Sequence, residues 1–268
     1  MFFGLLRALA RIRVTVAYTA ILVCATTAMM TLGPQAQSRI ISHASTNLHN
    51  LSRGHLGTLL VSAFVVDAGP IYVWLPGLVC LLAVAELMWR SGRLVVAFAA
   101  GHIGATLLVA IGLTAAVELG WMSSDVTRAT DVGMSYGASA VLGAMTAAIP
   151  RRWRPAWTGW WIAVAVAVVG IGRDFTDVGH AVALMLGMVV ASRFGRAARW
   201  GPVRCLLLIV GSSFGYLMLA TSGLTLSVAT CLGLAGAAFA EVVVGRRRDR
   251  EEASRADALS CGLTPGVA

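Results

Sequence analysis

Two apolar segments of the chain begin with residue types that could together perform nucleophilic chemistry. One begins Asp131-Val-Gly-Met-Ser135, and the other begins Asp177-Val-Gly-His180. A serine hydroxyl becomes a nucleophile when a histidine within hydrogen-bond reach takes its proton. Both side chains would lie about 5 Å inside the ends of their helices, because each follows its aspartate by about one turn. The spacing fits a Ser135–His180 dyad. It also fits a serine that bonds within its own helix and a histidine that only packs.

Ser139 is an alternative nucleophile, one turn further along the same segment. It would lie about 6 Å deeper than Ser135, so only one of the two serines can easily meet His180. We prefer Ser135, because its depth matches that of His180. The two aspartates are expected to cap their helices by accepting free backbone N–H groups, and small residues would let the helices approach closely. The capping and support residues predicted on this basis are Asp131, Gly133, Gly137, Gly143, Asp177, Gly179 and Gly187.

The composition indicates that these segments lie in a membrane. Of the 268 residues, 58% are hydrophobic and 12% are charged, whereas a typical soluble domain carries about 25% charged residues. This excludes a soluble enzyme, a disordered chain and a disulfide scaffold, and it predicts an all-α, polytopic helical membrane protein. A membrane helix needs about 20 predominantly apolar residues. Eight stretches qualify: 14–32, 70–88, 94–117, 132–149, 155–172, 177–194, 203–220 and 224–244.

The basic residues assign the loops to two sides of the membrane. The net charge is +9, and all 21 basic residues are arginines. With eight spans, 17 arginines fall on one side and four on the other. The positive-inside rule then places both termini in the cytoplasm and Ser135 and His180 near the outer face. The arginines are expected to set this topology and to contact lipid headgroups, not nucleic acid, so the predicted location is the cell membrane.

The remaining segments predict neither a cofactor nor a metal site. The five cysteines show no Cys-x-x-Cys spacing, which argues against disulfides and a zinc site. The longest outer segment, 33–56, could lie on the membrane surface, and 57–66 is too short to span the bilayer. Residues 1–13 are expected to form a cytoplasmic segment, and the charged tail 245–268 is expected to be disordered.

The two polar segments carry motifs that resemble those of the rhomboid family of intramembrane serine proteases. Gly133-Met-Ser135 and Gly137-Ala-Ser139 both resemble the start of the family's Gly-x-Ser-Gly motif. His180-x-x-Ala-x-x-x-Gly187 is similar to its His-x-x-Gly-x-x-x-Gly motif. In such a protease the serine attacks a peptide bond of a transmembrane substrate, and the histidine removes the serine proton. The resemblance therefore implies that Ser135, or alternatively Ser139, acts with His180.

Two shorter segments extend the resemblance to about residues 14–194. They are 58–64 and 86–93, and in the second Glu86 is expected to pair with Arg90 or Arg93. The resemblance implies a rhomboid-like six-helix core at 14–194. Two additional membrane helices at 195–244 would follow this core.

The chain departs from the family pattern at the oxyanion site. Rhomboid proteases usually carry a histidine and an asparagine on the second core helix, and residues 68–85 contain neither. Loss of one oxyanion donor typically costs roughly 10²–10³-fold in rate. In addition, Tyr136 and Ala140 follow the two candidate serines where the family has glycine.

Three functions therefore stay open. An active protease would cleave single-span transmembrane proteins near the outer face. A catalytically inactive pseudoprotease would bind transmembrane helices without cutting them. A transporter or channel, using His102 and Glu118, is the third possibility, although no inverted repeat supports it. The lipid bilayer is the common partner in all three cases.

Overall fold

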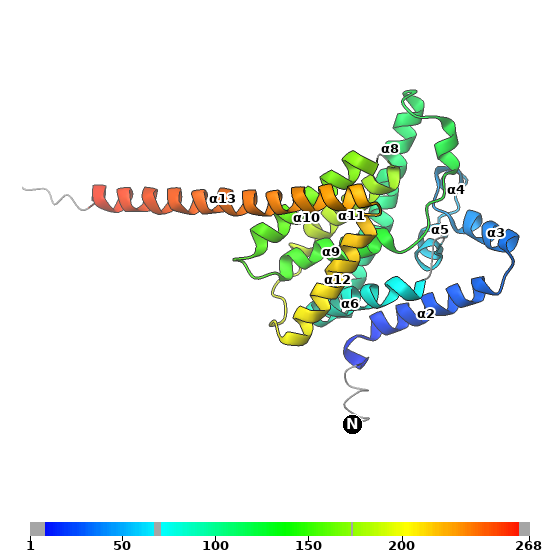
Figure 1. Cartoon of the computed structure of the whole chain (residues 1–268), viewed down its shortest axis with the longest axis horizontal. Coiled ribbons are helices and arrows are strands. Elements are labelled where there is room, and N and C mark those ends of the chain that lie inside the picture. The colour runs from blue at the N-terminus through cyan, green and yellow to red at the C-terminus, as the bar shows by residue number, and fades with distance from the viewer. Residues whose placement is uncertain (1–8, 67–70, 173, 263–268) are drawn as a thin grey trace, which may run out of the picture.

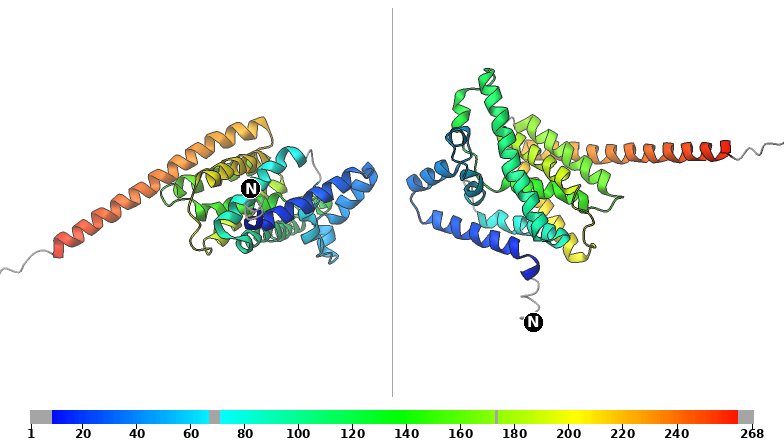
Figure 2. Two further views of the ribbon diagram at one scale, coloured as in Figure 1. Left: turned by 90° about the horizontal axis from the view of Figure 1, so that it is seen from below. Right: turned by 180° about the vertical axis from the view of Figure 1, so that it is seen from behind.

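The computed structural model describes residues 9–66, 71–172 and 174–262 (Figure 1). In these ranges the chain consists of helices and loops and has no β-strand, as expected for an all-α protein. The long helices are α2 (Arg13–Met30), α6 (Ile71–Trp89), α7 (Ser91–Ala99), α8 (Thr106–Glu118), α9 (Ser135–Ala148), α10 (Arg154–Gly172), α11 (Phe175–Ala191), α12 (Pro202–Leu219) and α13 (Gly223–Gly262). The π-helical turn η2 (Ala100–Ala105) joins α7 and α8 into one continuous rod, which Figure 2 shows from behind.

A helix lies at each of the eight predicted spans. Within the described ranges, six helical segments are long and apolar enough to cross a membrane: α2, α6, the α7–η2–α8 rod, α10, α12 and α13. The other two helices are shorter, since α11 has 17 residues and α9 has 14. Eleven residues of α9 are buried, so protein and not lipid surrounds this helix, and it does not need to match the bilayer thickness. The polytopic all-α architecture is therefore confirmed.

Glycines set the packing of α9 at the centre of the fold. A methyl group added at Gly143 would overlap the carbonyl of Leu184 on α11, and one at Gly187 would overlap the carbonyl of Ala140. A methyl group at Gly137 would lie 2.5 Å from the ring of Phe98 on α7. Small residues thus let the backbones touch, as predicted.

The two helices that follow the core pack against it from different places. On α6, Gly77 faces the ring of Phe214 on α12, while Gly211 on α12 faces the backbone of Leu81. The first half of α13 packs on α10, where Gly159 and Gly236 lie backbone to backbone. The helices α12 and α13 therefore lie against the core at α6 and α10 (Figure 1).

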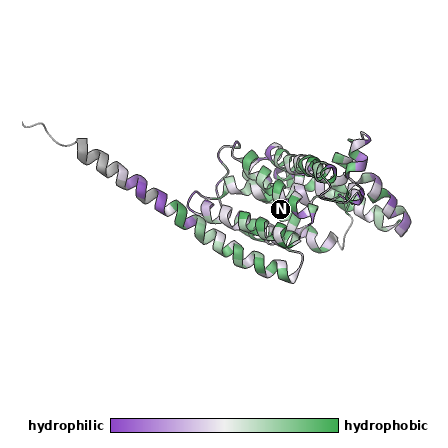
Figure 3. Ribbon diagram, turned by 90° about the horizontal axis from the view of Figure 1, so that it is seen from above, coloured by the Kyte–Doolittle hydropathy of each residue, from purple (hydrophilic) through white to green (hydrophobic). Residues whose placement is uncertain are grey.

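The C-terminal segment differs from the expected disordered tail. Helix α13 continues through residues 245–262, and Figure 3 shows that it becomes hydrophilic where the charged residues begin. Alanine, arginine and glutamate favour helices, and Arg247 and Glu251 are spaced to pair one turn apart. Residues 263–268 lie outside the described ranges.

Short helices form the segment between α2 and α6. They are α3 (Pro34–Ala44), α4 (Leu48–Ser52), α5 (Thr58–Val61) and the 3₁₀ turn η1 (Ser62–Phe64), and a further 3₁₀ turn, η3 (Ser124–Arg128), precedes α9. Residues 57–66 form no membrane span, as expected from their length. The loop between α3 and α4 is bonded to the loop before α9, which brings it to the candidate site.

Candidate functional site

Ser135 is the first residue of α9 and lies in an apolar groove. Gly133, two residues earlier, has φ +112°, a left-handed conformation that favours glycine. Its N–H donates to the carbonyl of Ser62 at 2.8 Å, which fixes the turn into α9. The groove encloses about 620 Å³ between α6, α9 and α12, and Ser135 lines it together with Trp74, Phe214 and other residues.

His180 lies on a different side of α9 from this groove. It packs against Tyr136, with the two rings edge to face and their centroids 5.1 Å apart. A side chain at Gly179 would overlap the Tyr136 ring, so this glycine makes room for the contact. Both ring nitrogens of His180 are buried and have no hydrogen-bond partner among the residues that the structure describes.

The rotation of α9 explains why the predicted dyad is not hydrogen-bonded. Tyr136, Ala140 and Gly143 repeat at helical spacing and all contact α11, Ala140 through its backbone. Ser135 precedes Tyr136 by about 100° of rotation, and it therefore points to the groove at α6 and α12. Ser139 is fully buried, and its hydroxyl finds no partner in the described part of the chain. The His180 ring therefore packs against the ring of Tyr136. Neither Ser135 nor Ser139 is hydrogen-bonded to it.

The predicted helix caps are wrong for both aspartates. The N-cap residue of α9 is Met134, which makes no side-chain cap, because the turn at Gly133 directs Asp131 elsewhere. The N-cap of α11 is Asp174, whose carboxylate accepts the N–H of Thr176 at 3.3 Å. Asp177 lies in the first turn of that helix instead, where a negative charge is favourable.

Asp131 binds the loop between α3 and α4 instead of capping α9. Its N–H donates to the hydroxyl of Ser45 at 2.9 Å, and its carbonyl accepts the N–H of Thr46 at 2.9 Å. The Thr46 hydroxyl also lies 3.2 Å from the carboxylate. Burial raises the pKa of Asp131 to about 6, and the bond from Thr46 offsets part of this rise. The loop between α3 and α4 is thereby attached to the turn that positions Ser135.

A second serine–histidine pair, which the sequence did not predict, lies next to the turn that precedes Ser135. The hydroxyl of Ser62 is 3.1 Å from Nε2 of His102 in the π-helical turn η2. Both residues are buried, so a peptide substrate cannot reach this hydroxyl. Because the Ser62 carbonyl also accepts the Gly133 N–H, the pair holds the turn before Ser135. The sequence indicated His102, because it is a polar residue in an apolar span. Nothing in the sequence indicated its partner Ser62, which lies 40 residues away.

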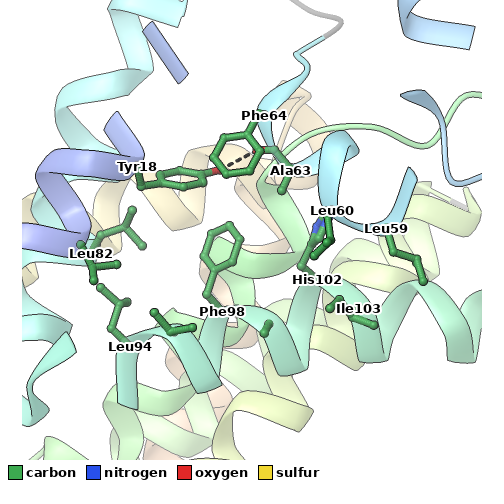
Figure 4. Close-up of a pocket in the computed structure, with 13 residues that line it drawn as sticks. Tyr18, Leu59, Leu60, Ala63, Phe64, Leu82, Leu94, Phe98, His102 and Ile103 are labelled. Atoms are coloured by element: carbon green, nitrogen blue, oxygen red, sulfur yellow. Dashed lines mark hydrogen bonds between the residues drawn. The ribbon is translucent and has the colours of Figure 1, made fainter. Parts of the chain in front are cut away.

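An apolar cavity adjoins His102 on the side of α2. It encloses about 240 Å³ and is lined by Tyr18, Phe98 and His102, among others (Figure 4). The Tyr18 hydroxyl donates to the carbonyl of Ala63 at 2.6 Å, which ties α2 to the turn η1. The apolar lining offers no charged group for chemistry, and the described residues contain no cluster of histidine, cysteine or carboxylate side chains that could hold a metal.

A known protein family matches most of this chain. A family model described as "rhomboid-like protein" matches residues 9–198. The chain belongs to this rhomboid-like family. No curated protein and no solved structure matches the chain. The rhomboid-like match covers α2 to α11 and ends before α12, so α12 and α13 follow the family core.

Proposed function

We propose that this rhomboid-like protein binds apolar helices of other membrane proteins in the groove beside Ser135 and does not cleave them. The supporting observation is the separation of the two candidate catalytic residues by the rotation of α9. Ser135 lines the groove, whereas the His180 ring nitrogens are enclosed beside Tyr136. A serine without a base in reach is a weak nucleophile, but its hydroxyl can still bond to a helix.

The groove has the chemistry expected for a transmembrane helix. Val73 and Leu217, on opposite walls, expose 76% and 60% of their surfaces. Lipid or a partner helix must cover such side chains in a membrane. Ser135 adds one hydrogen-bonding group, and serine hydroxyls commonly bond across helices in membranes. The proposed partners are therefore single-span membrane proteins.

An intramembrane serine protease is the second candidate function. Two observations support it: Ser135 lines an open groove, and His180 on the neighbouring helix packs against Tyr136, the residue that follows Ser135. Catalytic hydrogen bonds are often long or poorly aligned before substrate binds. Cleavage would require the His180 ring to leave Tyr136 and turn toward Ser135.

Cleavage of a single-span reporter in proteoliposomes separates the two functions. We expect the wild-type chain, Ser135→Ala and His180→Ala to leave the reporter equally intact. We also expect a serine-reactive fluorophosphonate to label none of them at Ser135. Cleavage by the wild-type chain that both variants abolish would establish the protease instead, and Ser139→Ala tests the alternative nucleophile in the same assay.

We further infer a multi-pass protein of the cell membrane with both termini in the cytoplasm. The arginine asymmetry over eight spans supports this orientation. A green fluorescent protein fused to the C-terminus is expected to fluoresce in intact cells. An alkaline phosphatase fused there is expected to stay inactive.

A further inference from the structure

A basic pocket lies at the end of the molecule opposite the groove, where α2, the α6–α7 turn and α12 meet. It encloses about 710 Å³. Four arginines line it, and they come from three parts of the chain far apart in sequence: Arg11 and Arg13, Arg90, and Arg204. The orientation inferred above places this pocket at the cytoplasmic surface of the membrane.

The acidic residue in the pocket does not neutralise these arginines. Glu86 was expected to pair with Arg90 or Arg93, but its carboxylate instead accepts the N–H groups of Val14 and Thr15 at 3.0 and 2.8 Å. It also accepts the hydroxyls of Thr15 and Ser91 at 2.7 and 2.6 Å. The residues that the structure describes show no ion pair to Glu86, and the pocket keeps a net positive charge because four arginines and one carboxylate line it.

Backbone groups add to the positive potential of the pocket. Helix α7 begins at Ser91 without a side-chain cap, and its first residues, Ser91 and Gly92, line the pocket. Uncapped helix starts present free N–H groups and the positive end of the helix dipole. Arg90, which precedes α7, has φ +73°, and it is the one non-glycine residue with positive φ in the described ranges. Arg90 is the N-cap residue of α7 and therefore lies at the N-terminal end of that helix.

Two of the four arginines are already oriented by hydrogen bonds, Arg13 to Ser91 and Arg204 to the carbonyl of Arg199. Nε of Arg13 donates to the Ser91 hydroxyl at 3.2 Å, which leaves the two terminal nitrogens of its guanidinium free to bind another group. Arg11 and Arg90 make no side-chain hydrogen bond within the described ranges. Guanidinium groups bind phosphate oxygens in pairs, more specifically than an ammonium does.

From this cluster we propose that the pocket binds a phosphate group, supplied either by the headgroup of an anionic lipid or by a free phosphate. The four arginines and the α7 start supply the donors. The pocket lies at the ends of membrane helices, where lipid headgroups are abundant and basic pockets between helices take anionic ones. This site is separate from the groove at Ser135, and it does not depend on whether the protein cleaves its partners.

The test measures lipid binding to the full chain by native mass spectrometry from detergent micelles. The probes are phosphatidylglycerol, phosphatidylcholine of equal chain length and inorganic phosphate. The test variant is the double substitution Arg11→Gln with Arg90→Gln. Its control is Arg193→Gln with Arg196→Gln, which removes the same charge from arginines outside the pocket.

We expect phosphatidylglycerol to bind the wild-type chain, and phosphatidylcholine to bind about tenfold more weakly. The pocket variant is expected to lose about tenfold or more in affinity for phosphatidylglycerol, and the control variant less than twofold. Phosphate binding with the same variant dependence, in the absence of lipid binding, would assign a free phosphate as the ligand. Equal losses in the two double variants, or no selective binding of either probe, would overturn the proposal.

Discussion

At the residue scale, the carboxylate of Glu86 joins three parts of the molecule. It caps the N-terminus of α2, it accepts the Ser91 hydroxyl at the start of α7, and it lies on α6 itself. The sequence suggested an arginine partner, because arginines lie four and seven residues further on. The structure shows that three of the four hydrogen bonds to this carboxylate come from a helix start more than 70 residues away in sequence.

Glu86→Gln is therefore expected to destabilise the protein. An amide in place of the carboxylate leaves at least one buried N–H of α2 opposite another donor, at a cost of about 1–3 kcal/mol. The measurement is the thermal unfolding of the full chain in detergent. Glu118→Gln, at an exposed helix end, is the control and should leave the Tm unchanged. Equal Tm values for the two variants would contradict this role of Glu86.

The buried carboxylate of Asp131 is expected to make the stability of the folded protein depend on pH. Burial raises its pKa in the folded protein to about 6, above the ordinary aspartate value. Between about pH 4 and 6 the folded state therefore binds more protons than the unfolded state, and stability falls as the pH rises through this range. Above pH 6 the buried charge continues to oppose folding.

Asp131→Asn tests this assignment. The neutral amide can still meet Thr46 and carries no buried charge, so we expect a higher Tm than wild type at pH 7 and a smaller difference at pH 4.5. The measurement is the Tm of both proteins between pH 4 and 8 in detergent. A constant difference between the two curves at every pH would show that Asp131 does not titrate in this range.

At the element scale, the packing of α9 against α11 controls the candidate site. The sequence placed Ser135 and His180 about one turn inside their helices, whereas Ser135 is the first residue of α9 and His180 is the sixth residue of α11. The sequence therefore misjudged both depths, because neither helix begins at the expected aspartate. It could not indicate the rotation of α9 about its axis. Contacts of Gly143 and Gly187 with backbone atoms of the partner helix set that rotation, and they turn Tyr136 instead of Ser135 toward His180.

Gly143→Ala is expected to weaken this helix contact. The added methyl group would overlap the Leu184 carbonyl, and overpacking of this kind costs about 1–3 kcal/mol. Gly112→Ala is the matched control, since a methyl group on that glycine of α8 meets no neighbouring atom. It should stabilise the helix by up to about 1 kcal/mol. Thermal unfolding of both variants checks the difference, and a Tm loss common to both would contradict it.

At the scale of the whole molecule, the sequence was sufficient for the architecture but not for the side-chain partners. Hydrophobic stretches predicted a helix at each of the eight positions, because apolar length is a local property of the chain. The partners of Glu86, Asp131 and His102 are non-local. They depend on how segments 40 or more residues apart lie side by side, which no spacing in the sequence records.

The charged C-terminal tail is another segment whose structure the sequence did not predict. High charge after residue 245 suggested disorder, whereas α13 extends to Gly262. The apolar half of this helix is fixed by its close contact with α10. Once a helix is nucleated, adding residues with good helix propensity costs little. The charged half therefore continues a helix that the membrane half has already formed.

Site-specific photocrosslinking most directly tests whether the groove binds partner helices without cutting them. Benzoylphenylalanine replaces Val73 in the groove, or Ile111 on α8 as the control, two aliphatic residues that expose 76% and 66% of their surfaces. Both proteins are reconstituted with a single-span membrane protein. We predict a crosslink to the intact partner from position 73 and little from position 111. Equal crosslinking from both positions, or a cleaved partner in the adduct, would contradict the proposed function.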